Sequence, residues 1–222
     1  GAAGVLLQKQ RAYAEVYNDL DSEICNFFRV LRTPALAEQL IAQLELTPYA
    51  RDEFAQAYEP VAEPVERARR TAVRACIGFG SAAATKGQTG FRCDTTRSYA
   101  TAQHLWARYP AGLWPIMERL QGVLIENRPA LDVIRQHDAH DTLHFVDPPY
   151  LHDTRVLQGA GSKGYYRHEM SNAEHLVLLE ALREVQGMVI LCGYPSAVYD
   201  DHLAGWSTAT TTSRISAGRG TG

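Results

Sequence analysis

Short apolar runs separated by polar turns divide the chain into alternating strand and helix patterns. Runs of four or five apolar residues are typical of buried strands, whereas apolar residues three and four positions apart indicate one face of a helix. By these patterns we expect four strands, near residues 14–17, 123–125, 142–146 and 188–192. Helical spacing follows most of these runs, for example at 130–136, so the chain predicts an α/β fold.

Capping residues indicate where several helices begin. Ser, Thr and Asp satisfy free N–H groups in the first helical turn, and proline fits the first helical position. The predicted helix starts are Asp21 or Ser22, Thr33–Pro34, Thr47–Pro48 and the capping box at Ser171–Glu174. We expect the corresponding helices to end near residue 32, near residue 46 and, for the capping box, near residue 185.

Residues 47–122 lack the alternation of strand and helix seen elsewhere. This stretch holds helical patterns rich in Arg and Ala, followed by a segment from Gly78 to Gly90 that is rich in Gly, Ser, Ala and Thr. We therefore expect an α/β core made of residues 1–46 and 123–222, interrupted by an inserted, mainly helical domain at 47–122.

Positive charge is concentrated in this insertion. Eight Lys and Arg residues but one acid, Asp94, lie between Arg67 and Arg108, although the 222-residue chain has a net charge of −3. Such a basic stretch is typical of a phosphate-binding surface, and a solvated helix face followed by a loop is the alternative. The basic residues are Arg67, Arg69, Arg70, Arg74, Lys86, Arg92, Arg97 and Arg108.

The remaining composition argues against several classes of protein. The apolar runs are too short for a membrane span and the sequence begins without a signal-peptide pattern, so we expect a cytoplasmic protein. The four cysteines have neither CxxC spacing nor a histidine at ligand spacing. This favours reduced, structural thiols over a metal site or a disulfide framework.

The sequence Asp147-Pro148-Pro149-Tyr150 directly follows the apolar run at 142–146. Prolines fix φ and lack an N–H, so the chain leaves the strand as a rigid turn whose carbonyl oxygens stay available as acceptors. Asp147 and the Pro148 carbonyl can then both face a crevice at the carboxyl end of the sheet. Two adjacent acceptors fit an amino group with two N–H bonds, and Tyr150 offers a face on which a planar base can stack.

This tetrapeptide after an apolar strand resembles the catalytic motif of amino-group DNA methyltransferases, especially the adenine-N6 enzymes that use S-adenosylmethionine. The order of the segments, with a small-residue turn first, a basic insertion next and the tetrapeptide last, is similar to the alpha class of this family, which includes Dam-type and phage-borne adenine methylases. The resemblance extends to residues 126–129, 166–170 and 193–196. It implies a Rossmann-like methyltransferase core with a target-recognition domain at 47–122.

The resemblance also assigns residues to the cofactor. The turn at 1–4 resembles the end of the family's glycine-rich motif, where the backbone passes the methionine part of S-adenosylmethionine. Asp19 matches the acid that accepts hydrogen bonds from the ribose hydroxyls, with Asp21 as its nearest alternative. The expected cofactor contacts are Gly1, Ala2, Ala3, Asp19 and Asp147, and no metal is implied.

In the implied reaction, a target adenine leaves the duplex and stacks on Tyr150, while Asp147 and the Pro148 carbonyl hold its amine. No covalent enzyme intermediate is needed. The loop at 86–92 is expected to enter a DNA groove, where Gln88 could face adenine and Arg92 guanine, although phosphate contact is the commoner role of arginine. The expected DNA contacts are Lys86, Gln88, Arg92 and Arg97.

Three alternatives stay open. A cytosine-N4 methyltransferase also acts on an exocyclic amine, but its motif more usually begins with Ser. Protein glutamine methylation normally uses Asn at that position and gives the basic insertion no purpose. A catalytically silent DNA-binding protein on the same fold is the third alternative.

Two features of the family are missing from this sequence: the segment before the glycine turn and a final apolar strand. We therefore expect the chain to be part of a longer protein, encoded by a bacterium or a phage. A restriction endonuclease partner is compatible with the resemblance, and the sequence specifies neither that partner nor the recognition site.

Overall fold

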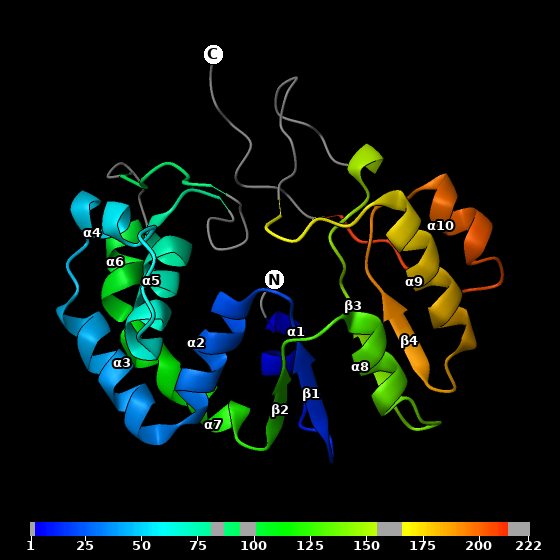
Figure 1. The fold of residues 1–222 in the computed structure, drawn as a ribbon, viewed down its shortest axis with the longest axis horizontal. Coiled ribbons are helices and arrows are strands. Elements are labelled where there is room, and N and C mark those ends of the chain that lie inside the picture. The colour runs from blue at the N-terminus through cyan, green and yellow to red at the C-terminus, as the bar shows by residue number, and fades with distance from the viewer. Residues whose placement is uncertain (1–2, 81–86, 94–100, 155–165, 213–222) are drawn as a thin grey trace. The chain divides into compact units, whose positions relative to one another are not determined.

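The computed structural model describes residues 3–80, 87–93, 101–154 and 166–212, which combine helices with short strands (Figure 1). In chain order the elements are α1 (Gly4–Gln8), β1 (Glu15–Asn18), α2 (Ser22–Arg32), α3 (Pro34–Leu46), α4 (Arg51–Gln56), α5 (Pro64–Ile77), α6 (Ala102–Arg108), η1 (Pro110–Gly112), α7 (Leu113–Leu120), β2 (Val123–Glu126), α8 (Ala130–His137), β3 (Leu143–Val146), η2 (His152–Thr154), α9 (Asn172–Glu184), β4 (Met188–Leu191) and α10 (Ala197–His202). Within these described ranges, none of the helices has the length and apolarity needed to cross a membrane.

The chain divides into two compact units, Gly1–Arg128 and Pro129–Gly222. Among the residues that the structure describes, each unit holds one pair of parallel strands, β1 with β2 in the first and β3 with β4 in the second. This confirms the expected mixture of helices and parallel strands, which is compatible with the α/β class. The two units meet after Arg128, whereas the predicted insertion spans residues 47–122. The two divisions differ because α5, which lies within the predicted insertion, packs against α2 inside the first unit.

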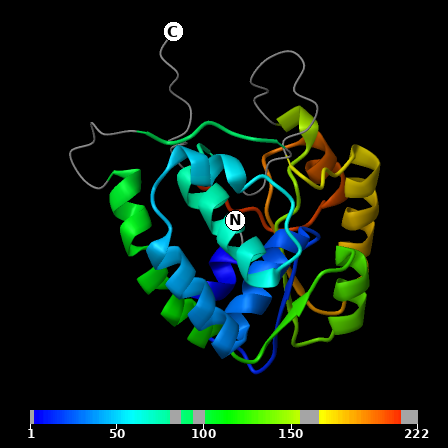
Figure 2. The ribbon, with the colours of Figure 1, turned by 60° about the vertical axis from the view of Figure 1, so that its left-hand side comes forward.

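Helices α2, α3 and α5 form most of the first unit's core, and Figures 1 and 2 show them side by side. Each presents an apolar face to the others, and burying one leucine or phenylalanine side chain contributes about 1.5–3 kcal/mol. The most buried large side chains of this core include Phe28, Leu31, Leu40, Leu44, Val65 and Ile77.

The predicted helix starts are confirmed at three places and wrong at one. Asp21 caps α2, Pro34 opens α3, and the capping box before α9 is present, with the Ser171 N–H donating to Glu174 at 2.7 Å. The start predicted at Thr47–Pro48 is wrong, since α4 begins at Arg51. The Thr47 hydroxyl instead donates to a carbonyl in the last turn of α3, so this residue ends a helix rather than beginning one.

One face of the β3–β4 pair in the second unit is covered by helices. Val146, Val189 and Leu191 pack with side chains of α8 and α9, including Ile134 and Leu178. The opposite face carries Leu143, Phe145, Met188 and Ile190, which are 42–56% exposed. The prediction of buried strands therefore holds for one face of these two strands and is wrong for the other. Successive side chains point to opposite faces, so a continuous apolar run cannot reveal whether both faces are covered.

Candidate active site

The tetrapeptide predicted to be catalytic lies at the carboxyl end of β3, directly after Val146. The strand end is fixed because the Cys192 N–H donates to the Val146 carbonyl at 2.9 Å, one step beyond the last paired residues of β3 and β4. Asp147 is exposed, whereas Pro148–Pro149 and Tyr150 are half-buried. The acid is therefore open to solvent on a turn whose following residues are held by packing.

The Tyr150 ring lies against the Tyr194 ring, which follows β4. The two ring centroids are 4.9 Å apart and the ring planes meet at 74°, an edge-to-face contact. Burial, followed by the nearby Asp147 carboxylate, raises the pKa of Tyr150 to about 12. At neutral pH this side chain is therefore an uncharged aromatic surface.

The chain after Tyr150 is held by the segment that precedes α9. Leu151 is buried, and its carbonyl accepts hydrogen bonds from the N–H and the hydroxyl of Thr154. His152 Nε2 lies 3.8 Å from a carboxylate oxygen of Glu169, and the other oxygen of Glu169 accepts a 2.6 Å hydrogen bond from the Tyr166 N–H. These contacts bring residues 166–170, one of the family-like segments, next to the tetrapeptide.

Asp19 lies directly after β1, as predicted. Its Oδ2 accepts a 2.9 Å hydrogen bond from the Tyr17 hydroxyl, and its Oδ1 accepts one of 2.9 Å from the Asp21 N–H. Burial and the neighbouring Asp19 carboxylate raise the pKa of Tyr17, which keeps this donor protonated. Each carboxylate oxygen has a second lone pair, so Asp19 is oriented and can still accept further hydrogen bonds.

Asp21, the alternative to Asp19, has a structural role. Its carboxylate accepts a 2.9 Å hydrogen bond from the Glu23 N–H at the start of α2, and its side chain is buried. Between the two acids, this geometry favours Asp19 as the group available to a ligand.

Two asparagines fix the carboxyl ends of β1 and β2. The Asn18 side chain accepts a hydrogen bond from the Arg128 N–H at 3.1 Å and donates one to the Arg128 carbonyl at 3.0 Å. The Asn127 amide donates to the Asp19 carbonyl at 2.7 Å. The residues after β2, another family-like segment, therefore hold the backbone that carries Asp19.

The structure describes the turn before α1 from Ala3 onward. Gly1 and Ala2, two of the predicted cofactor contacts, lie outside the described residues. Ala3 has a φ of 55°, a left-handed conformation that is uncommon for a residue other than glycine. A Cβ placed on Gly4 would meet no atom within 4 Å, so there is open space beside this backbone.

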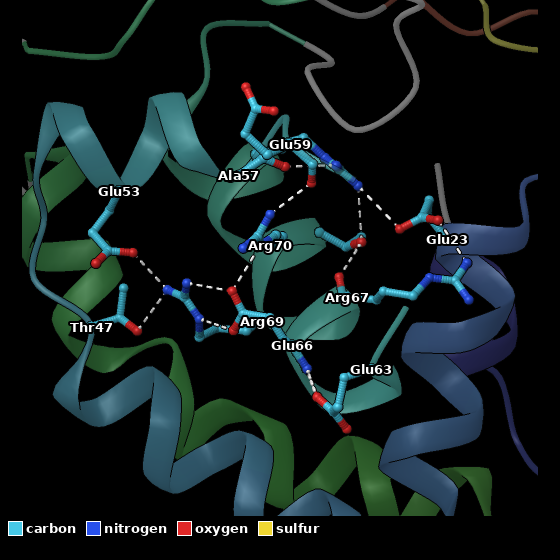
Figure 3. A network of polar contacts seen from close by, with 12 residues as sticks. Glu23, Thr47, Glu53, Ala57, Glu59, Glu63, Glu66, Arg67, Arg69 and Arg70 are labelled. Atoms are coloured by element: carbon cyan, nitrogen blue, oxygen red, sulfur yellow. Dashed lines mark hydrogen bonds and ion pairs between the residues drawn. The ribbon is translucent and has the colours of Figure 1, made fainter. Parts of the chain in front are cut away.

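The basic segment is largely occupied by ion pairs, which Figure 3 shows around α5. Arg69 donates to Glu66 at 2.6 and 2.8 Å and to Glu53 at 2.8 Å, and Arg70 donates to Glu66 at 2.7 Å. These arginines lower the pKa of Glu66, with Arg69 as the main cause. Glu53 and Glu66 lie before Arg67 in the sequence, so the acids that pair with this basic stretch stand outside it.

The other two α5 arginines of the stretch are also engaged. Arg67 donates to Glu23 at 2.7 Å, and Arg74, which is 8% exposed, donates to the Ala57 carbonyl at 2.8 Å. Arg70 also donates to the Glu59 carbonyl at 2.7 Å, outside α5. Four of the eight basic residues of the stretch therefore connect α5 to neighbouring segments. These four arginines therefore form neither the predicted phosphate-binding surface nor the alternative, a solvated helix face.

The predicted DNA-contacting loop is anchored through Phe91. This ring contacts Tyr49 and Phe54 and lies 4.6 Å from the Arg51 guanidinium, so it packs in the first unit's core. Gln88 is exposed, and Arg92 is half-buried with its N–H donating to the Ile77 carbonyl at 2.9 Å. Lys86 and Arg97 lie outside the described residues.

Sequence reasoning missed the residues that hold the predicted ones in place. Tyr17 and Asn127 orient Asp19, and Tyr194 contacts Tyr150. The contact between Tyr150 and Tyr194 could have been predicted from the sequence, because an aromatic residue follows shortly after each of two apolar strands. A comparison of the chain with protein-family models and with curated proteins finds no match in either.

Proposed function

We propose that this protein is a site-specific DNA methyltransferase that transfers a methyl group from S-adenosylmethionine to the N6 amine of adenine in duplex DNA. The observation that carries this proposal is the tetrapeptide at the carboxyl end of β3, with an exposed acid and a half-buried tyrosine ring held edge-to-face by a second ring. Ligands of parallel α/β sheets bind at this end of the strands.

Asp147 and the Pro148 carbonyl would accept the two N–H bonds of the amine. Both are hydrogen-bond acceptors, so they orient the nitrogen lone pair outward and stabilise the positive charge that grows on nitrogen during transfer. When bound, the cofactor supplies an electrophilic methyl group. Tyr150, uncharged at neutral pH, would stack on the extruded base and offset part of its unstacking cost of a few kcal/mol.

Asp19 would hold the ribose of the cofactor. Its two carboxylate oxygens keep acceptor capacity after the bonds from Tyr17 and Asp21, and two ribose hydroxyls are matching donors. The open space beside Gly4 fits the close passage of a ligand along the backbone. The fold that accompanies this proposal is a Rossmann-like methyltransferase core, and Asp147 is proposed as a further cofactor contact.

The DNA contacts of this proposal fall on fewer residues than the charge count suggested. The α5 arginines are engaged in ion pairs and carbonyl contacts, so phosphate binding rests on the loop around Gln88 and Arg92, on Lys86 and Arg97, and on Arg108 of α6, which is exposed. The same residues would serve a cytosine-N4 enzyme or a catalytically silent DNA-binding protein.

The decisive experiment is methylation of a mixed-sequence duplex, with the modified nucleosides identified by mass spectrometry. We expect N6-methyladenine from the wild type and none from Asp147→Ala. Asp141→Ala is the matched control, because Asp141 is an exposed acid just before the same strand. If the product is N4-methylcytosine, the protein is a cytosine-N4 methyltransferase and the assignment to adenine is wrong. DNA binding without cofactor binding or product would identify a silent protein.

A further inference from the structure

We propose that Tyr194 is a positioning residue that holds the Tyr150 ring in the plane on which a nucleobase stacks, so that the two rings form an aromatic corner. This inference rests on the proposed function for the identity of its guest, a planar base with an exocyclic amine. Its geometry lies entirely within the second unit.

The two rings are brought together by the register of the parallel strands. Val146 of β3 pairs with Leu191 of β4, and the Cys192 N–H donates to the Val146 carbonyl at 2.9 Å. Tyr150 and Tyr194 each follow within four residues of this last pair, so they leave the sheet at the same end. The edge-to-face angle of 74° leaves both rings partly accessible, with Tyr194 44% exposed.

The turn that carries Tyr194 lies against the half-buried ring of Tyr199. A Cβ built on Gly193 would lie 2.5 Å from Cε2 and 3.1 Å from Cζ of Tyr199, a separation that real side chains do not tolerate. The Gly193 backbone therefore lies directly against the Tyr199 ring. Gly193 does not have a left-handed φ, so the close approach of the Tyr199 ring is what favours glycine at this position.

Tyr199 is itself held from two sides. It lies in the first turn of α10, whose start is fixed because the Ser196 hydroxyl accepts a 3.2 Å hydrogen bond from the Val198 N–H. Its ring centroid is 6.1 Å from that of His175 on α9, a fully buried side chain. Burial raises the pKa of Tyr199, so the ring contacts its neighbours as an uncharged group. Contacts thus run from α9 through Tyr199 and Gly193 to Tyr194.

The contact with Tyr194 would fix the orientation of the Tyr150 ring. A single tyrosine rotates about its side-chain bonds, whereas a ring held edge-to-face against a second ring presents a fixed plane. A base stacked on that plane would present its exocyclic amine to Asp147 in one orientation. Tyr194 would therefore act on the base through Tyr150, and its removal would loosen the ring rather than remove it.

The test uses a short single-stranded oligonucleotide that contains one 2-aminopurine, whose fluorescence falls when it stacks on an aromatic ring. This probe needs neither base extrusion nor methyl transfer. We expect quenching by the wild type, an affinity about 2- to 10-fold lower for Tyr194→Ala, and near wild-type behaviour for Tyr194→Phe, because the ring and not the hydroxyl makes the contact. Tyr13→Ala is the control, since Tyr13 is fully exposed.

Two further variants separate positioning from a general loss of structure. Gly193→Ala keeps both rings of the corner but displaces the Tyr199 ring, and we expect it to weaken quenching about as much as Tyr194→Ala does. In the double variant Tyr150→Ala with Tyr194→Ala, we expect no further loss beyond Tyr150→Ala alone, since Tyr194 acts through Tyr150.

The fluorescence experiment tests the aromatic corner, and the methylation assay tests the proposed function, so the two can fail separately. Unchanged quenching in Tyr194→Ala, additive losses in the double variant, or no quenching by the wild type would overturn the aromatic corner. Quenching with the expected variant pattern, together with a wild type that methylates no base, would support the corner and overturn the proposed methyltransferase function.

Discussion

The hydroxyl of Tyr17 donates a 2.9 Å hydrogen bond to Oδ2 of Asp19, two residues further along the same strand end. Tyr17 is itself held in the core, where its ring meets that of Phe28 edge-to-face with centroids 5.1 Å apart. The orientation of an acid proposed to bind cofactor is therefore set by a side chain that is fixed by packing.

Replacing Tyr17 by phenylalanine should weaken S-adenosylmethionine binding while keeping the fold. One hydrogen bond to a charged carboxylate is worth about 1.5–3 kcal/mol, of which only the part that orients Asp19 appears in the affinity, so Asp19→Ala should cost more. Calorimetry measures both. Asp21→Ala is the contrasting variant: we expect cofactor affinity to be retained and the fold to lose about 0.5–2 kcal/mol with the cap of α2. The reverse pattern would move the ribose contact to Asp21.

Tyr150→Ala should reduce methyl transfer through lost stacking, by about 1–3 kcal/mol for one base on one ring. Tyr150→Phe should be much milder, since it keeps the aromatic face. Steady-state rates on one duplex at fixed salt compare the variants. Equal losses in both would assign the function to the hydroxyl instead of the ring.

Acid should remove a defined part of the stability of the first unit. Glu15, at the start of β1, accepts hydrogen bonds of 2.6 and 2.8 Å from Arg119, and Arg119 is the main cause that lowers the pKa of Glu15 from 4.5 to about 2. A pKa lowered by folding means that the carboxylate stabilises the fold above pH 4.5. This stabilisation is lost as the pH falls through about 2.

The measurement for Glu15 is thermal unfolding between pH 2 and 7. Glu15→Gln should unfold at a lower temperature than the wild type at neutral pH, and the difference should shrink toward pH 2. Glu45→Gln, at an exposed position on α3, should follow the wild type throughout. A constant difference across the range would show that the substitution acts through packing and not through charge.

Neutralising Arg92 and Arg97 together should weaken duplex binding and reduce its salt dependence. Each lost phosphate contact lowers the log–log slope by about 0.9 for duplex DNA. Arg70→Gln is the control, because Arg70 is paired with Glu66 and should affect stability rather than DNA affinity. Superimposable salt titrations for the wild type and the double variant would exclude this loop as the DNA contact.

Local signals in the sequence located most of the elements that carry the candidate site. Asp21 and Ser171 cap helices where the sequence predicts, and the runs before Asp19 and Asp147 form strands. These features depend on residues within a few positions of one another. Helix capping and strand formation can therefore be predicted without knowing the fold.

Contacts between distant segments could not be predicted in this way. The arginines of α5 are partnered by acids of α2 and α4, such as Glu23 and Glu53, so a count of charge along the chain overestimated the free positive charge. Phe91, in a loop that the sequence assigned to DNA, is half-buried and packs against the rings of Tyr49 and Phe54.

The positions of the candidate site residues along the chain could be read from the sequence: an acid after β1, and an acid, two prolines and a tyrosine after β3. How those residues are held became clear from the packed fold, through Tyr17 on Asp19 and Tyr194 against Tyr150. The two kinds of feature differ in the range of the interactions that produce them. Capping and strand propensity act between neighbours in sequence, whereas ring contacts and ion pairs depend on which strand ends and helix faces the packed chain brings together.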